Sequence, residues 1–197
     1  MIDKNVAQKN FDFACSKYEE VQDIVQELSN FAKEVESSFS FDVAMRQYDC
    51  ILQALLLRVA AEDGYFLEEE KQFIEKIALY GSVKEYLKGK YDLDMEYDYF
   101  FHYDKKELKE ITTKMFAMLD KLIEDFVAPF AIIDAHLSKD YYKLINEATM
   151  LIVCALCGVD TDDTKSAAFQ GELGIAIKYF NASFEKYWKQ YLASAKK

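Results

Sequence analysis

A scarcity of glycine and proline constrains the fold of this chain more than any other feature of its sequence. There are six glycines and one proline among 197 residues. β-Sandwich and α/β proteins contain many tight turns, and tight turns depend on these two residues. Their scarcity predicts long helices joined by short polar loops. No segment shows the apolar–polar alternation of a strand. We therefore expect an all-α protein.

Length and composition predict a single domain. A chain of 197 residues is near the upper end of ordinary single-domain size. Its 51% of hydrophobic residues can form a sizeable core. No linker rich in glycine, proline or serine divides the sequence. We predict one domain over residues 1–197, a bundle of seven to nine helices, with about residues 1–38 forming an N-terminal helical extension.

Apolar residues recur at three- and four-residue steps along several long segments, which is the spacing of one face of a helix. We expect a first helix over residues 6–35 and a second over 41–61, whose broad apolar face predicts a central position. Pro129 is expected to kink or restart its helix, because proline lacks a backbone donor and clashes with the preceding turn. Asn181 is expected to separate two C-terminal helices, with Ser183 capping the second. The predicted inner stripe of the first helix consists of Tyr18, Val21, Ile24, Val25, Leu28, Phe31, Ala32 and Val35.

The charge of the chain restricts its partners. A formal net charge of −11 and a pI near 4.7 argue against nucleic acid, which requires clustered Lys and Arg. The same charge disfavours anionic lipid. It is compatible with cations, with basic partners or with a role in solubility alone.

Targeting signals and cysteine usage predict a cytoplasmic protein. The first twenty residues contain no apolar region of the length that a secretory signal needs. No run of about 18 apolar residues predicts an integral membrane segment. Four cysteines are too few for a disulfide scaffold in a chain of this size.

Two segments of the sequence echo one another. LLLRVAAEDG over residues 55–64 and IVCALCGVDT over residues 152–161 both read as an apolar helix, rich in small residues, that runs into an Asp-bearing turn. This similarity predicts two pseudo-repeated helical hairpins.

The most specific local pattern is AAEDGYFLEEEKQFIEKIA, from Ala60 to Ala78. It resembles the tellurite-resistance TerB-like family, in which a helix rich in small residues ends in Ala-Asp-Gly and a Glu cluster follows. The similarity covers about Tyr48 to Ala78, and the Asp-Gly pair and Glu70 are its strongest elements. The resemblance implies an all-helical bundle that binds a divalent cation through acidic residues, in a stress or membrane-associated complex.

The acidic loops support a cation site on chemical grounds as well. Carboxylates are hard oxygen ligands, which Ca²⁺ and Mg²⁺ require, so we expect either of these ions in preference to Zn²⁺. If both loops lie at one end of the bundle, they can share an ion. The alternative is that these acids cap helix N-termini and complement the helix dipole. The candidate metal ligands are Asp63, Glu69, Glu70, Asp160, Asp162 and Asp163.

No catalytic motif is visible, and we expect a protein that is not an enzyme. The only histidines, His102 and His136, are isolated, and there is no nucleophile elbow or phosphate-binding loop. Cys154 and Cys157 form a lone CxxC in an apolar segment. We expect them to pack in the core as small apolar residues, and the alternative is a redox or soft-metal role.

Two function hypotheses remain open. The first is a non-enzymatic TerB-like helical protein that binds a divalent cation through its acidic inter-helix loops. The alternative is a protein–protein interaction or scaffold module without metal. Its docking elements would be the long N-terminal helix and the aromatic segment from Tyr91 to Tyr103. In either case the expected partner is another protein or a second copy of the chain.

Overall fold

The computed structural model describes residues 4–35, 40–60, 67–77, 105–134, 141–157 and 166–195. These ranges contain six helices and no strand, which confirms the all-α prediction for this part of the chain. The predicted seven to nine helices and the repeated hairpins depend in part on residues outside these ranges. The helices are α1 (Lys4–Val35), α2 (Phe41–Ala60), α3 (Glu68–Ile77), α5 (Lys105–Asp134), α6 (Tyr141–Cys157) and α7 (Ser166–Ala195).

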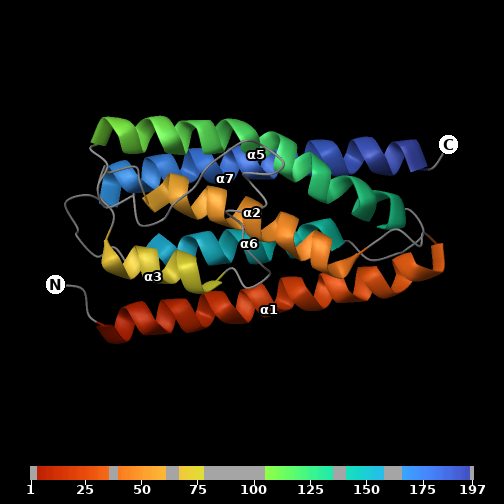
Figure 1. Ribbon diagram of the computed structural model, residues 1–197, viewed down its shortest axis with the longest axis horizontal. Coiled ribbons are helices and arrows are strands. Elements are labelled where there is room, and N and C mark those ends of the chain that lie inside the picture. Colours follow the sequence, from red (N-terminus) through yellow and green to blue (C-terminus); the bar gives the residue numbers. More distant parts are fainter. Residues whose placement is uncertain are drawn as a thin grey trace.

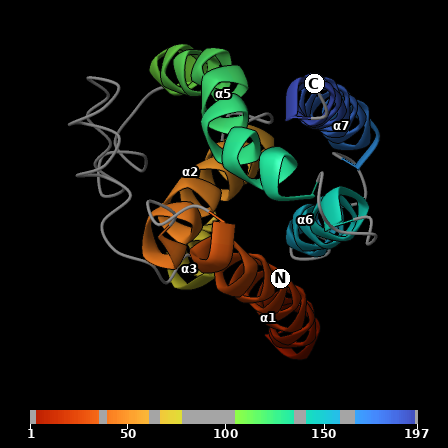
Figure 2. The same cartoon turned by 90° about the vertical axis from the view of Figure 1, so that its right-hand side faces the viewer.

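The long helices lie side by side and alternate in direction. In Figure 1, α1, α5 and α7 run one way, whereas α2 and α6 run the other way. The end-on view of Figure 2 shows α2 in the middle of the other helices. Helix α2 contacts all five of them, and fourteen of its twenty residues are buried. Its predicted central position is therefore confirmed.

Helices α1 and α6 pack as an antiparallel pair with the spacing of a coiled coil. The Tyr141 hydroxyl donates a hydrogen bond to Glu27 at 2.9 Å, which aligns the start of α6 with the C-terminal half of α1. Alternating steps of four and three residues average 3.5, the repeat of a coiled-coil seam. The buried residues with this spacing are Ala14, Tyr18, Val21, Val25, Leu28 and Ala32 on α1 and Tyr141, Ile145, Ala148, Ile152 and Ala155 on α6.

The inner stripe of α1 is narrower than the sequence analysis predicted. Phe31 is 39% exposed, and Ile24 is only partly buried. Both lie one position before a seam residue, so a 3.5-residue seam leaves them at its edge.

Aromatic side chains fill the contact between α2, α5 and α7. Phe126 on α5 lies 5.7 Å from Tyr48 and 6.3 Å from Phe184 on α7, measured between ring centroids. Phe184 in turn stacks on Trp188 at 5.8 Å. All are almost fully buried, and such pairs stabilise by about 0.5–1.5 kcal/mol each beyond the burial itself.

The sequence left two alternatives open at Pro129, a kink or a restart, and the restart is wrong. Helix α5 continues through Pro129, and its axis bends towards its C-terminal end in Figure 1. Buried neighbours on both sides of the proline, Phe126 and Phe130, hold the segment against the bundle. Helix α7 likewise continues through Asn181 and Ser183. The Ser183 hydroxyl does not cap a helix but donates to Asp120 on α5 at 2.7 Å.

Within the described ranges, none of the helices combines the length and apolar character needed to cross a membrane.

Candidate functional site

Two of the six predicted metal ligands, Glu69 and Glu70, lie in the described residues. Glu70 is 2% exposed and is the third residue of α3. Its Oε2 accepts a hydrogen bond from the backbone N–H of Leu67 at 2.9 Å. The Leu67 carbonyl accepts the first helical hydrogen bond, from Lys71 at 3.0 Å. Glu70 therefore forms half of a capping box, which supports the capping interpretation at this position.

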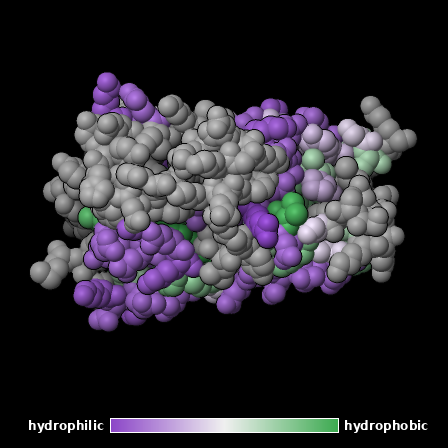
Figure 3. All heavy atoms as spheres, viewed as in Figure 1, coloured by the Kyte–Doolittle hydropathy of each residue, from purple (hydrophilic) through white to green (hydrophobic). Residues whose placement is uncertain are grey.

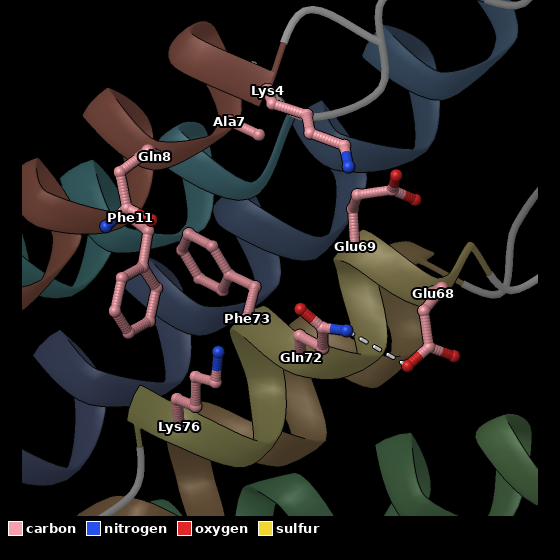
Figure 4. Close-up of a pocket in the computed structure, with 9 residues that line it drawn as sticks. All are labelled: Lys4, Ala7, Gln8, Phe11, Glu68, Glu69, Gln72, Phe73 and Lys76. Carbon is pink, nitrogen blue, oxygen red and sulfur yellow. Dashed lines mark hydrogen bonds between the residues drawn. The ribbon is translucent and has the colours of Figure 1, made fainter. Parts of the chain in front are cut away.

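Glu69 lines a cleft between the N-terminal part of α1 and helix α3 (Figure 4). The cleft has a volume of about 440 Å³. Phe11 and Phe73 meet edge to face in it, with ring centroids 5.6 Å apart and an interplanar angle of 79°. The other lining residues are Lys4, Ala7, Gln8, Glu68, Gln72 and Lys76.

The charges around this cleft balance one another. Two ammonium groups and two carboxylates line it, and Figure 4 shows the Lys4 ammonium pointing towards the Glu69 carboxylate. Gln72 donates a hydrogen bond to Glu68 at 3.1 Å. The acids at the start of α3 and Lys76 in its last turn also complement the helix dipole. Figure 3 shows the corresponding surface over α1 and α3 as mostly hydrophilic. An ammonium that points towards Glu69 opposes a second cation beside it.

The other predicted ligands, Asp63, Asp160, Asp162 and Asp163, lie outside the described residues. The helices that are described contain no group of three or more His, Cys, Asp or Glu side chains placed to hold a metal ion. A shared cation between the two acidic loops therefore stays a prediction.

Sequence reasoning missed a partly apolar groove on the outer side of the α1–α6 pair. Its volume is about 360 Å³. Leu144 is 38% exposed and Leu151 is 40% exposed, and they lie two turns apart on α6. Partly buried Ile24 borders them from α1. The groove is lined by Lys17, Glu20, Asp23, Ile24, Leu144, Glu147, Ala148 and Leu151.

Exposed apolar side chains continue along α1 on the same stripe as Ile24, beyond both ends of the groove. Phe13 is 44% exposed and Phe31 is 39% exposed. At 3.6 residues per turn, both project within about 20° of Ile24. We call the groove, together with Phe13 and Phe31, the α1–α6 face. It holds four of the seven exposed large apolar side chains among the described residues, those of Phe13, Phe31, Leu144 and Leu151, the others being Val6, Val43 and Tyr179.

The groove of the α1–α6 face is acidic. Three of the four charged groups that line the groove are the carboxylates of Glu20, Asp23 and Glu147. The fourth is the Lys17 ammonium, which forms an ion pair with Glu20. The apolar residues of this face on α1 stand immediately before seam residues. This signal can be read from the sequence only once the partner helix is known.

Cys154 is exposed on α6, so the expectation that it packs in the core is wrong. Its last-turn neighbours Ala155 and Leu156 occupy the buried positions instead. Partial burial raises the pKa of the Cys154 thiol, so the group stays protonated at neutral pH and is a poor nucleophile.

Buried hydroxyl groups connect α1, α2 and α6. The Tyr18 hydroxyl donates to the fully buried carboxylate of Asp49 at 2.5 Å. The hydroxyls of Tyr48 and Thr149 lie 3.0 Å apart, and Thr149 also donates to the carbonyl of Ile145 at 2.7 Å. These groups bind one another across helix contacts, so they contribute to packing and to the register of the helices.

A second polar cluster joins α5 to α7. Asp120 accepts hydrogen bonds from Ser183 at 2.7 Å and from Tyr187 at 2.5 Å. Partial burial raises the pKa of Asp120, but these two hydrogen bonds and the nearby Lys186 ammonium outweigh it, and the pKa lies below its ordinary value. The hydrogen bond to Asp120 in turn raises the pKa of Tyr187. Both shifts follow from a contact between helices.

No protein-family model, curated protein or solved structure shows a significant match to this chain. The resemblance to TerB-like proteins therefore rests on the residues from Tyr48 to Ala78 alone.

Proposed function

We propose that this chain is a non-enzymatic protein-interaction module that binds its partner on the α1–α6 face. The observation that supports the proposal is the concentration of exposed apolar side chains there, rimmed by charged groups. Contiguous apolar patches with a polar rim are typical of protein interaction sites. Burial of such side chains by a partner stabilises a complex by about 25 cal/mol per Å² of apolar surface.

The polar clusters favour this proposal over an enzyme. The Tyr18–Asp49 and Asp120–Tyr187 pairs hold helices of the bundle together. They do not line either of the two clefts described above. A catalytic site usually combines a concave pocket with titratable groups whose pKa values are shifted.

Cation binding has less support within the described residues. Glu70 holds the N-terminus of α3, and the Lys4 ammonium points towards Glu69. The other predicted ligands are Asp63, Asp160, Asp162 and Asp163. Added metal ions test them directly.

Site-specific photo-crosslinking tests the proposed function. A photoreactive amino acid at Leu151 is expected to form one discrete adduct in extracts of the native cells, identifiable by mass spectrometry. The control is the same amino acid at Gln190, an exposed position on α7. The identified protein, once purified, is expected to bind the parent chain and not the Leu144→Glu/Leu151→Glu variant. Adducts that are absent at Leu151, or identical at Gln190, would contradict the proposal.

A further inference from the structure

We infer that the partner on the α1–α6 face is a single basic amphipathic helix, which lies along the groove and completes a three-helix assembly with α1 and α6. This inference rests on the proposed function and specifies its partner. It is carried by three features of the face: its helical geometry, its length and its charge.

The geometry of the groove suits a helix. Helices α1 and α6 are antiparallel and meet through a 3.5-residue seam. The residues beside such a seam form the groove into which a third helix packs in helical bundles. Ile24, Leu144 and Leu151 occupy these positions. A helix with apolar residues at i, i+3 or i+4, and i+7 presents a matching stripe to such a groove.

The length of the face defines the length of the partner. Phe13 and Phe31 are 18 residues apart on one stripe of α1, which corresponds to about 27 Å of helix. A partner helix of about 18 residues spans the same distance. Leu144 and Leu151 contact its central two turns from the opposite wall, because α6 is aligned with the middle of α1.

The charge of the face selects a basic partner. The groove carries three carboxylates, and its single ammonium is already paired with Glu20. The chain as a whole has a formal net charge of −11. Lys and Arg beside the apolar stripe of a partner gain from this potential and accelerate association. A second copy of the chain would place the same acidic face against this one, and like charges repel.

Synthetic peptides test the inference with the full-length chain. The probe is a 21-residue helix with Leu at heptad positions a and d and Lys at e and g. Two matched peptides carry Gln or Glu in place of each Lys. Isothermal titration calorimetry is expected to show the tightest binding for the Lys peptide, binding at least several-fold weaker for the Gln peptide, and none for the Glu peptide. Added salt should weaken the Lys peptide most.

One variant separates groove binding from simple charge attraction. Leu144→Glu/Leu151→Glu makes the chain more acidic, so attraction by charge alone would tighten the Lys peptide. If the peptide binds in the groove, the loss of two apolar anchors should instead weaken binding of the Lys peptide at least tenfold. Circular dichroism and thermal unfolding of the variant check that the bundle is intact.

A matched pair of variants tests the acidic rim. Glu20→Gln/Glu147→Gln and Glu110→Gln/Glu185→Gln remove the same formal charge, but only the first pair lines the groove. The first is expected to weaken the Lys peptide several-fold, and the second is expected to leave its affinity within about twofold.

Each contrary result has a distinct meaning. Equal binding of the Lys, Gln and Glu peptides would overturn the basic partner and leave the proposed function in place. Lys-peptide binding that survives Leu144→Glu/Leu151→Glu would overturn both. Sedimentation velocity tests for a dimer of the chain. If a dimer forms and Leu144→Glu/Leu151→Glu dissociates it, the partner is a second copy and the basic helix is overturned.

Discussion

Replacement of Asp120 by Asn tests whether the hydrogen bonds between α5 and α7 stabilise the bundle as the structure indicates. The carboxylate accepts one hydrogen bond from Ser183 at 2.7 Å and one from Tyr187 at 2.5 Å. Asn retains one acceptor oxygen and loses the charge, so one of the two contacts is lost and the other becomes a neutral hydrogen bond.

The expected cost follows from the geometry. A hydrogen bond to a charged group contributes about 1.5–3 kcal/mol when buried. Asp120 is half-buried, and solvent reduces the value, so we expect Asp120→Asn to lower the free energy of unfolding by about 1–2 kcal/mol. For a chain of this size, that corresponds to a decrease in Tm of about 2–8 °C.

The stability difference between the parent chain and Asp120→Asn should depend on pH. The pKa of Asp120 is lower in the folded protein than in the unfolded chain, where it is about 3.9. Its contribution is therefore complete above the unfolded pKa and is lost as the pH falls through the folded pKa. Asn does not titrate. The difference in stability between the parent chain and the variant should shrink as the pH falls below about 4.

Urea unfolding followed by circular dichroism at pH 7, 5, 4 and 3 measures this difference. The control is Glu110→Gln on the same helix, where an exposed carboxylate pairs with Lys106 at 4.0 Å. Its effect should stay below about 0.5 kcal/mol. A difference for Asp120→Asn that does not change between pH 7 and pH 3 would refute the charge-assisted hydrogen bonds as the source of stability.

Further variants test other contacts by the same unfolding measurement. Tyr18→Phe removes a donor to a buried carboxylate and should cost about 1.5–3 kcal/mol, whereas Tyr48→Phe removes a neutral hydroxyl pair and should cost about 0.5–1.5 kcal/mol; equal costs would contradict this distinction. Phe126→Ala leaves a cavity in the aromatic core and should cost about 3–5 kcal/mol; a cost below 1 kcal/mol would show that the core repacks freely. Glu70→Ala removes the cap of α3 and should lower the free energy of unfolding by about 1 kcal/mol without added metal. An unchanged free energy of unfolding would show that the Glu70 cap does not stabilise α3. For the cation hypothesis, Ca²⁺ or Mg²⁺ at about 100 times its Kd should stabilise metal-stripped protein by about 2.7 kcal/mol, and Asp63→Asn should abolish the effect; no shift with either ion excludes cation binding in that range.

The bounds of α2 and the start of α3 were predictable because they depend on interactions within a few residues. The second helix was expected over 41–61 and spans Phe41–Ala60. Its apolar residues surround the axis, and this breadth alone indicated a central position. The start of α3 was marked by its run of glutamates, and the structure places Glu70 on the backbone N–H of Leu67.

Helix continuity was not predictable from local signals. Pro129 and Asn181 weaken a helix locally, but α5 does not restart at Pro129 and α7 does not end at Asn181. Phe126, Phe130 and Phe184 lie beside these positions and are almost fully buried. Burial of such side chains contributes about 1.5–3 kcal/mol each, which together offsets the local cost.

The α1–α6 face shows most clearly what the sequence by itself determined and what only the tertiary structure decided. The sequence determined that α1 and α6 are amphipathic helices, because apolar periodicity is a property of each segment. Tertiary packing placed Ile24 beside Leu144, 120 residues away along the chain. It also selected the 3.5-residue seam that leaves Phe31 in solvent. Which edge of an apolar stripe stays exposed depends on the helix packed against it, and that information is not present in either helix alone.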